Sequence, residues 1–244
     1  MSVIDKIKKI KNISKSYCSA VIVAAGNSQR MGKDKILMDI GGAPVIAYTL
    51  RSFQASEVID EIIIVTKGES IQRMADICSE YGITKARRVV CGGKTRAESA
   101  LIGVSNTSEN ATVIAIHDGA RPFPSRALIE RAVMAAEESY AAAPAVRATD
   151  TVRILNKKGV VVDTPDRELI ALVQTPQVFN ADIIKGALTK AVEKNLPITD
   201  DCSAVEAMGF KVVIVDGERD NIKLTTQSDI YAAEKILADR GTLM

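Results

Sequence analysis

The fold is most visible in residues 20–35, which read AVIVAAGNSQRMGKDK. Residues 20–24 form a short apolar run rich in β-branched residues, the pattern of a strand buried on both faces of a parallel sheet. The run passes directly into a loop of small residues that ends in clustered cations. Amides beside alanine and glycine can approach phosphate oxygens closely, and Arg30 and Lys35 can offset charge on a phosphoryl group in transfer. The stretch therefore predicts a strand followed by a phosphate-binding loop.

Similar apolar runs recur along the chain, at 61–66, 86–90, 113–117, 143–148 and 211–216. Between them, segments such as 71–78, 97–104 and 129–136 place apolar residues at i, i+3, i+4 and i+7, which is typical of a helix that covers one face of a sheet. Two helix starts show capping-box spacing, at Thr95 with Glu98 and at Thr226 with Asp229. A third is marked by Pro44, which suits a first helical turn. This alternation predicts an α/β fold with a mostly parallel sheet flanked by helices.

Residues 150–165 break the alternation. Two short β-like pieces, Thr151–Leu155 and Val160–Val162, flank the turn-forming residues 156–159. A two-stranded ribbon alone is marginally stable in water, so we expect it to lean on the body or on another subunit. The sequence predicts a β-hairpin arm projecting from a single domain, residues 17–244, with residues 1–16 as a basic N-terminal extension.

Composition narrows the class of protein. The chain has 244 residues, 47% of them hydrophobic, which suits one globular domain. Its net charge of +2 is too small to give an overall electrostatic field that attracts nucleic acid or a membrane surface. The lysine-rich extension lacks the apolar core of a signal peptide, and no later run approaches transmembrane length. Four cysteines without a C-x-x-C pair, and one histidine, give little support to a zinc or redox centre. We expect a cytoplasmic protein with free thiols.

Two other nucleotide-binding classes fit poorly. In dinucleotide folds the glycine loop enters a helix at once, and an acid about 20 residues on holds the ribose. Here Gly41, Gly42 and Pro44 postpone the helix, and the second strand ends in Thr66-Lys67. Walker lysine spacing is also missing, so neither a nicotinamide-dependent oxidoreductase nor a P-loop kinase is favoured. An ordinary tight turn with solvated cations remains an alternative for the first loop.

A second candidate site element is CGGKTRAES at residues 91–99. The glycine pair Gly92-Gly93 precedes Lys94 and a capped helix start, where free amides attract anions, and Ser99 can add a hydroxyl one turn in. The alternative is a tight turn and helix cap, with Arg96 in a structural ion pair.

A third element, HDGARP at residues 117–122, ends the fourth strand. Ligands of open parallel sheets bind beyond the carboxyl ends of the strands, so Asp118 and Arg121 are expected to meet magnesium and phosphate. His117 has no serine elbow for a hydrolase triad, and we expect it to be structural. Further polar groups at 166–167, 174–177 and 220–223 would complete a cationic pocket for two phosphorylated substrates.

In this order, the motifs resemble the 2-C-methyl-D-erythritol 4-phosphate cytidylyltransferase family, from about Tyr17 to Leu237. The resemblance rests on Ala24-Ala25-Gly26 with Arg30-Met31, Lys35, Gly92-Gly93 with residues 96–99, residues 117–122, Asp150-Thr151-Val152, Asp166-Arg167, Thr175-Pro176-Gln177, Thr199-Asp200-Asp201 and Asn221-Ile222-Lys223. Six or more motifs in the right order make the match specific.

The resemblance implies a Rossmann-like nucleotidyltransferase fold. It also implies a reaction in which the phosphate of methylerythritol phosphate attacks the α-phosphorus of CTP and magnesium pyrophosphate leaves. Arg30 and Lys35 would then stabilise the transition state, and Arg167 with Lys223 would position the acceptor phosphate. The other contacts implied are Ala24, Ala25, Gly26, Gly92, Gly93 and Ser99 towards CTP, and Arg121, Thr151 and Thr175 towards the acceptor. Lys94 and Asp118 would be further substrate-binding residues. Asp118 would be the contact to Mg²⁺ or another divalent cation.

The same resemblance implies a homodimer in which each arm reaches into the partner subunit, where Thr151 would serve the neighbouring pocket. The sequence departs from the family pattern at Ser28, where a glycine is usual, and in the extension before Tyr17. Two rivals stay open: ribitol 5-phosphate cytidylyltransferase, with the same fold and another acceptor, and a nucleotide-binding module without turnover. The segments at 199–201 and 166–167 favour methylerythritol phosphate as the acceptor.

Overall fold

The computed structural model describes residues 16–26 and 35–241. Among these residues the strands are β1 (Cys18–Val23), β2 (Asp39–Ile40), β3 (Ala43–Pro44), β4 (Glu61–Thr66), β5 (Ala86–Cys91), β6 (Val113–Asp118), β7 (Ala141–Arg147), β8 (Ile154–Leu155), β9 (Val161–Asp163), β10 (Ala171–Val173), β11 (Gln177–Asn180) and β12 (Val213–Asp216). The helices are α2 (Val45–Ala55), α3 (Ile71–Glu80), α4 (Arg96–Ser105), α5 (Arg126–Ser139), α6 (Ala181–Glu193), α7 (Asp201–Glu206) and α8 (Gln227–Asp239), with short 3-10 turns η1 (Gly68–Ser70) and η2 (Arg167–Leu169).

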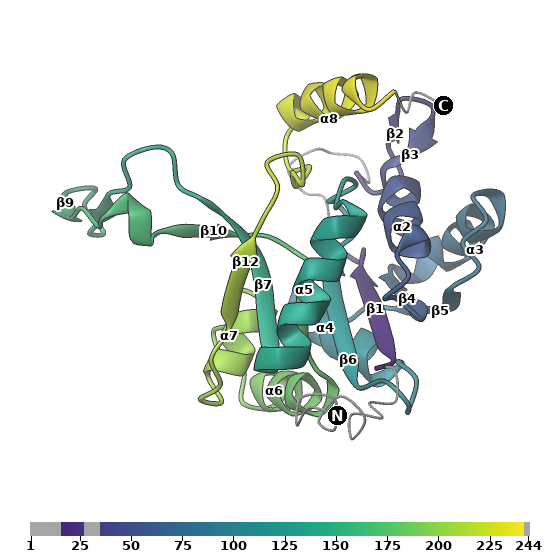
Figure 1. The fold of residues 1–244 in the computed structure, drawn as a ribbon, viewed down its shortest axis with the longest axis horizontal. Helices are drawn as coiled ribbons and strands as arrows, with labels where there is room; N and C mark the ends of the chain where they lie inside the picture. The colour runs from purple at the N-terminus through teal and green to yellow at the C-terminus, as the bar shows by residue number, and fades with distance from the viewer. Residues whose placement is uncertain (1–15, 27–34, 242–244) are drawn as a thin grey trace, which may run out of the picture.

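One mixed sheet organises the body (Figure 1). Its strand order is β10-β7-β11-β6-β1-β4-β5, and β12 also pairs with β7. The pairs of β1 with β4 and β6, of β4 with β5, and of β12 with β7 are parallel. Strands β10 and β11 pair antiparallel with their neighbours. The expected mostly parallel sheet flanked by helices is therefore confirmed, with β10 and β11 as short antiparallel strands that the sequence pattern does not separate.

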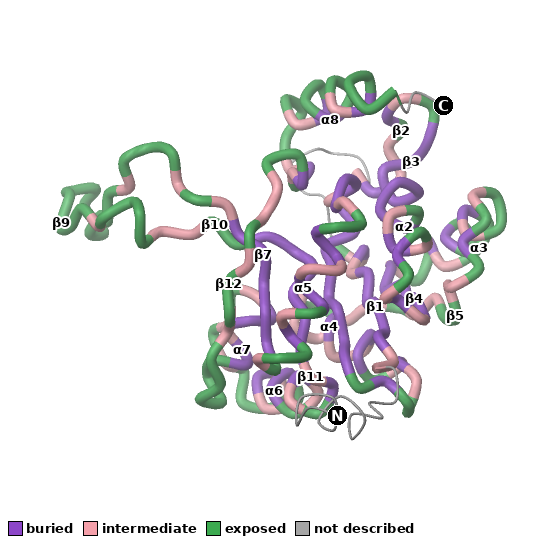
Figure 2. The backbone as a smooth tube through the Cα atoms, in the orientation of Figure 1, coloured by how far each residue is buried: buried purple, intermediate pink, exposed green. Residues whose placement is uncertain are grey.

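Each face of the sheet carries its own apolar cluster. Alternate residues of β1 point to opposite faces, so Ile22 joins one cluster and Val21 the other. Helices α2, α3, α5 and α8 contribute to the first cluster, and α4, α6 and α7 contribute to the second. Figure 2 shows the central strands buried between these layers. Strands covered on both faces need apolar side chains at successive positions, which explains the continuous runs in β1, β4 and β6.

The arm leaves the body as a separate two-stranded sheet of β8 and β9, seen at the left of Figure 1. Its turn is closed by the Asn156 amide donating to the Val160 carbonyl at 2.9 Å, with Gly159 at a φ of 77°. The arm is largely exposed in Figure 2. The predicted hairpin is thus present. Its first strand is shorter than the sequence pattern indicated, and its second strand is displaced by one residue.

The basic extension lies almost entirely outside the described residues. Along the part of the chain that the structure describes, no helix combines the length and apolar character needed to cross a membrane.

Candidate active site

A cavity of about 480 Å³ lies at the carboxyl ends of neighbouring strands β6, β1, β4 and β5. From β1 the chain proceeds to β4 and β5 on one side and returns to β6 on the other, so the cavity lies where the strand order reverses. Open α/β sheets bind their ligands at this place. The predicted site residues that line it are Ala24, Ala25, Gly26, Lys35, Gly92, Gly93, Lys94, Ser99, Asp118 and Lys223.

Other predicted site residues lie elsewhere. Arg30, like Ser28, falls outside the described residues. Thr151 belongs to the arm, and Arg167 lies just beyond it in η2, where its Nη1 donates to the Thr149 carbonyl at 3.4 Å. Arg121 and Thr175 lie beside Asp118 without lining the cavity. One chain therefore brings together the CTP-side residues and Lys223, whereas Thr151 and Arg167 remain apart from them.

The turn between β5 and α4 differs from expectation. Thr95 caps α4 as predicted, accepting a hydrogen bond from the Glu98 amide. The preceding amides, however, are not free. The Gly92 amide donates to the Thr66 carbonyl at 2.8 Å, the Gly93 amide to Ser99 Oγ at 3.1 Å, and the Lys94 amide to Glu98 Oε2 at 2.7 Å. The prediction that this turn offers free amides to an anion is wrong for these three groups, because carbonyl and side-chain oxygens within the fold already accept from them.

Glycine at 92 and 93 has a steric explanation instead. A Cβ at Gly92 would lie 2.5 Å from Ala25 Cβ and 2.8 Å from Ser99 Oγ, and a Cβ at Gly93 would lie 2.4 Å from Glu98 Cβ. The loop after β1 and the turn after β5 therefore pack against each other at backbone distance. Glycine allows this close approach.

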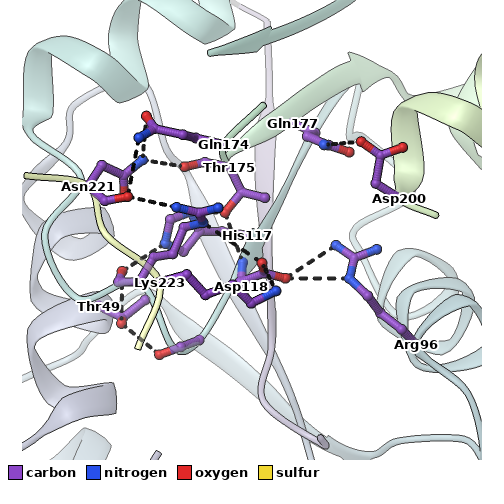
Figure 3. A network of polar contacts seen from close by, with 12 residues as sticks. Thr49, Arg96, His117, Asp118, Gln174, Thr175, Gln177, Asp200, Asn221 and Lys223 are labelled. Carbon is purple, nitrogen blue, oxygen red and sulfur yellow. Dashed lines mark hydrogen bonds and ion pairs between the residues drawn. The ribbon is translucent and has the colours of Figure 1, made fainter. Parts of the chain in front are cut away.

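Asp118 is the centre of the site's electrostatics (Figure 3). Among the described residues, its carboxylate is 2.7 Å from Lys223 Nζ, 3.3 Å from Arg96 Nη2 and 3.9 Å from Arg121 Nε. Burial alone would raise the pKa of Asp118, but the charges of Arg96 and Lys223 outweigh it and hold the pKa well below its usual range. Asp118 is therefore ionised at neutral pH and fixes the position of Lys223 at the cavity.

His117 lies directly behind Asp118. It is fully buried, and its ring centroid is 4.8 Å from that of Phe53. Burial lowers the pKa of His117 to about 4, so the ring is neutral at physiological pH. Its placement away from the cavity agrees with the expectation of a structural histidine.

Two features of the site were not fully predicted from the sequence. The alternative interpretation of the 91–99 turn gave Arg96 a structural ion pair, but neither its place in the cavity nor its partner, the fully buried Asp201 at the start of α7, was predicted. Thr66 and Lys67 line the cavity at the end of β4. The sequence did carry a signal for Lys67, because it follows the buried parallel strand that neighbours β1. The pairing of Arg96 with Asp201 had no such signal, because 105 residues separate them.

Comparison with known proteins identifies the family. Residues 18–239 match the family model described as IspD, 2-C-methyl-D-erythritol 4-phosphate cytidylyltransferase. The chain belongs to the IspD family. Curated proteins of that name from Clostridium botulinum (strain ATCC 19397 / Type A) and Caldanaerobacter subterraneus subsp. tengcongensis are each 40% identical to it. The alignments cover 90% of this chain and 96% and 98% of the respective relatives.

Solved structures of the IspD family agree with the fold. The 4-diphosphocytidyl-2C-methyl-D-erythritol synthase of Anaerococcus prevotii DSM 20548 matches with a TM-score of 0.84 and 33% identity, over 93% of this chain and 98% of that one. The cytidylyltransferase of Thermus thermophilus matches with a TM-score of 0.74 and 28% identity, over 89% and 98%. The expected Rossmann-like nucleotidyltransferase fold is therefore confirmed for this member of the IspD family.

Proposed function

We propose that the chain transfers a cytidylyl group from CTP to 2-C-methyl-D-erythritol 4-phosphate, in non-mevalonate isoprenoid biosynthesis. The products are pyrophosphate and 4-diphosphocytidyl-2-C-methyl-D-erythritol. The observation that carries the proposal is a cation-lined cavity at the strand-order reversal of an IspD-family chain. Nucleotidyl transfer depends mostly on positioning and charge neutralisation, and the cavity supplies both.

The charges around the cavity match a triphosphate. Among the described residues that line it, Asp118 is the sole carboxylate, and the cations are Lys35, Lys67, Lys94, Arg96 and Lys223. These cations come from the first loop, the end of β4, the turn before α4, α4 itself and the segment after β12. The first four would surround the triphosphate from several directions, and Lys223 would face the acceptor phosphate, so that charge on several phosphoryl oxygens is offset.

The reaction balances without a protein base. An oxygen of the acceptor phosphate, already ionised at neutral pH, forms a bond to the α-phosphorus of CTP. The bond from the α-phosphorus to the oxygen bridging to the β-phosphorus breaks, and pyrophosphate leaves with that electron pair. Lys35 and Arg30 would offset the charge that develops on the α-phosphoryl oxygens, and Lys223 with Arg167 would hold the acceptor phosphate in line. No imidazole is required, which is consistent with the burial of His117.

A divalent cation fits the site if the phosphates of the substrate supply most of its ligands. In the described part of the chain, no three His, Cys, Asp or Glu side chains are grouped to hold a metal ion by themselves. Mg²⁺ commonly takes one or two carboxylates together with substrate phosphates, so Asp118 would hold it beside the triphosphate. When bound, the ion would neutralise charge on the departing pyrophosphate.

The arm supports a homodimer. Large apolar residues of the arm and of η2, which follows it, are between 48% and 81% exposed: Ile154, Leu155, Val161 and Leu169. Apolar surface of this kind on a ribbon that is separate from its own body favours cover by a second subunit. In the proposed dimer, the arm would bring Thr151 and Arg167 to the partner subunit's pocket. We propose that the dimer works in the cytoplasm and binds neither nucleic acid nor a membrane.

Pyrophosphate release tests the function. The purified chain is incubated with CTP and Mg²⁺, and with either methylerythritol phosphate or ribitol 5-phosphate as the acceptor. Release with the former is expected. Release with ribitol 5-phosphate alone would keep the chemistry and change the acceptor, whereas CTP binding without release in either reaction would replace the proposal with a binding module.

A further inference from the structure

His117 is the only histidine of the sequence, and no step of the proposed reaction uses it. It is fully buried beside Phe53 and does not line the cavity, so it cannot contact a substrate there. Yet both ring nitrogens have polar partners at short range: Nε2 lies 3.0 Å from the Arg121 carbonyl oxygen, and Nδ1 lies 2.9 Å from Thr175 Oγ1. Both nitrogens of the buried ring are therefore satisfied. Both partners are tied to residues 118–121, since Arg121 is one of them and Thr175 contacts the Asp118 amide.

The partners determine the tautomer. A carbonyl oxygen only accepts, so Nε2 carries the proton and donates to Arg121. Nδ1 then has a free lone pair, and the Thr175 hydroxyl donates to it. The same hydroxyl oxygen accepts from the Asp118 amide at 3.1 Å. A ring with one proton therefore satisfies every group in this sequence of hydrogen bonds.

These bonds hold both ends of one turn. Residues 118–121 form a turn in which the Arg121 amide donates to the Asp118 carbonyl at 3.0 Å. The imidazole reaches Arg121 directly and Asp118 through Thr175, while Thr49 Oγ1 donates to the Gly119 carbonyl at 3.0 Å. Figure 3 shows His117 and Thr175 beside Asp118, on the side away from Arg96. The turn that carries Asp118, and with it the ion pair of Asp118 with Lys223, is therefore held from the side of His117.

We propose that His117 is a positioning residue of the reaction, holding the 118–121 turn through Thr175 and Arg121 in its Nε2-protonated tautomer. The role rests on the proposed function, because the acceptor phosphate is the group that Lys223 and Arg121 would meet. Misplacement of a reacting group by about 1 Å can reduce the rate about 100-fold. Loss of the imidazole should therefore impair use of the acceptor more than binding of CTP.

Three substitutions separate the two hydrogen bonds from packing. His117→Gln keeps a donor near the position of Nε2, His117→Asn keeps an acceptor near Nδ1, and His117→Phe keeps a ring against Phe53 and neither bond. We expect kcat to fall roughly 10- to 100-fold in His117→Phe and less in the other two, with a rise in the acceptor KM and less than about a threefold change in the CTP KM.

Thr175→Val supplies a matched control, since it removes only the hydroxyl. If both residues act through one chain of hydrogen bonds, the double variant with His117→Phe should be no slower than the slower single variant. Thermal unfolding of each variant is recorded alongside, so that a variant that does not fold is recognised. His117→Phe that folds with wild-type kcat and acceptor KM would overturn the proposal, as would fully additive losses.

The tautomer is tested without any turnover. Because the chain has one histidine, ¹⁵N labelling of the ring gives one pair of nitrogen resonances in the full chain. A protonated Nε2 and an unprotonated Nδ1 are expected at pH 7.5, and a protonated Nδ1 would overturn the proposal. If the wild type releases no pyrophosphate with either acceptor, the proposed function fails and the positioning role with it. An active wild type with an unaffected His117→Phe variant removes the role alone.

Discussion

Arg96 and Asp201 form a two-point ion pair at the back of the cavity. Nη1 donates to Oδ1 at 2.9 Å and Nη2 to Oδ2 at 2.7 Å, and Nη2 also lies 3.3 Å from Asp118. Asp201 is fully buried, whereas the Arg96 side chain is 32% exposed towards the cavity. The pair therefore joins the start of α7 to the site and sets the position of the guanidinium that Asp118 shares.

Removing the buried charge should be costly. In Asp201→Asn, Arg96 keeps its contact with Asp118 but loses the fully buried carboxylate that accepts from both Nη atoms, which should cost about 1–3 kcal/mol of unfolding free energy. Urea denaturation measures the loss. Glu57→Gln is the control, because its pair with Arg126 is solvent-exposed, with Glu57 80% exposed, and should matter little. Equal losses in the two variants would contradict the assigned importance of the pair.

Two helix glycines should respond in opposite directions to alanine. A Cβ at Gly103 in α4 would lie 2.3 Å from Val21 Cγ1, whereas at Gly186 in α6 the nearest atom is 3.9 Å away. We expect Gly103→Ala to lose about 1–3 kcal/mol of unfolding free energy through overpacking against β1. Gly186→Ala should gain up to about 1 kcal/mol through helix propensity. Denaturation of both variants checks the signs, and stabilisation of both would mean that α4 can shift off the sheet.

Lys35→Ala should lose turnover and keep the fold. Lys35 lines the cavity beside the loop after β1, and removing one preorganised electrostatic group commonly lowers kcat about 100- to 1,000-fold. Pyrophosphate release and circular dichroism measure the two effects. Lys235→Ala is the control, because Lys235 is 72% exposed on α8 and its ion pair with Asp239, one helical turn further on, lies at the surface. Wild-type kcat in Lys35→Ala would refute its role in charge stabilisation.

Acid should destabilise the chain through His117. The pKa of its imidazole is about 4 in the folded state and 6.5 when the ring is fully solvated, so the unfolded chain binds more protons between these values. The stabilising contribution is thus full above pH 6.5 and falls as pH decreases, by about 1 kcal/mol at pH 5.5. Urea denaturation at pH 7.5 and 5.5 measures the loss. His117→Gln should lack this component, and an unchanged pH dependence in that variant would assign the effect to carboxylates.

The sequence predicted those parts of the fold whose signal is local. Strands β1, β4 and β6 were recognised because burial on both faces demands unbroken apolar runs, and α4 because Thr95 caps it. Strands β10 and β11 were not separated, since three or four residues carry little periodicity. Their antiparallel pairing depends on neighbours distant in the chain.

In the site, too, features with a local signal were predicted and features that depend on tertiary packing were not. Loops that follow parallel strands were placed correctly, because strand order brings their carboxyl ends together. The state of the Gly93 amide was not predictable, since Ser99 occupies it from the next helical turn. Neither was Asp201 as the buried partner of Arg96, because only tertiary packing brings together these two residues, which lie 105 positions apart.

Strand β1 contributes to the apolar clusters on both faces of the sheet and ends in the loop that lines the cavity. Neither layer can loosen on heating without disturbing the strand that carries this loop. Thermal inactivation should therefore follow the unfolding curve rather than precede it, and a stabilising substitution in either layer should extend the working temperature of the enzyme.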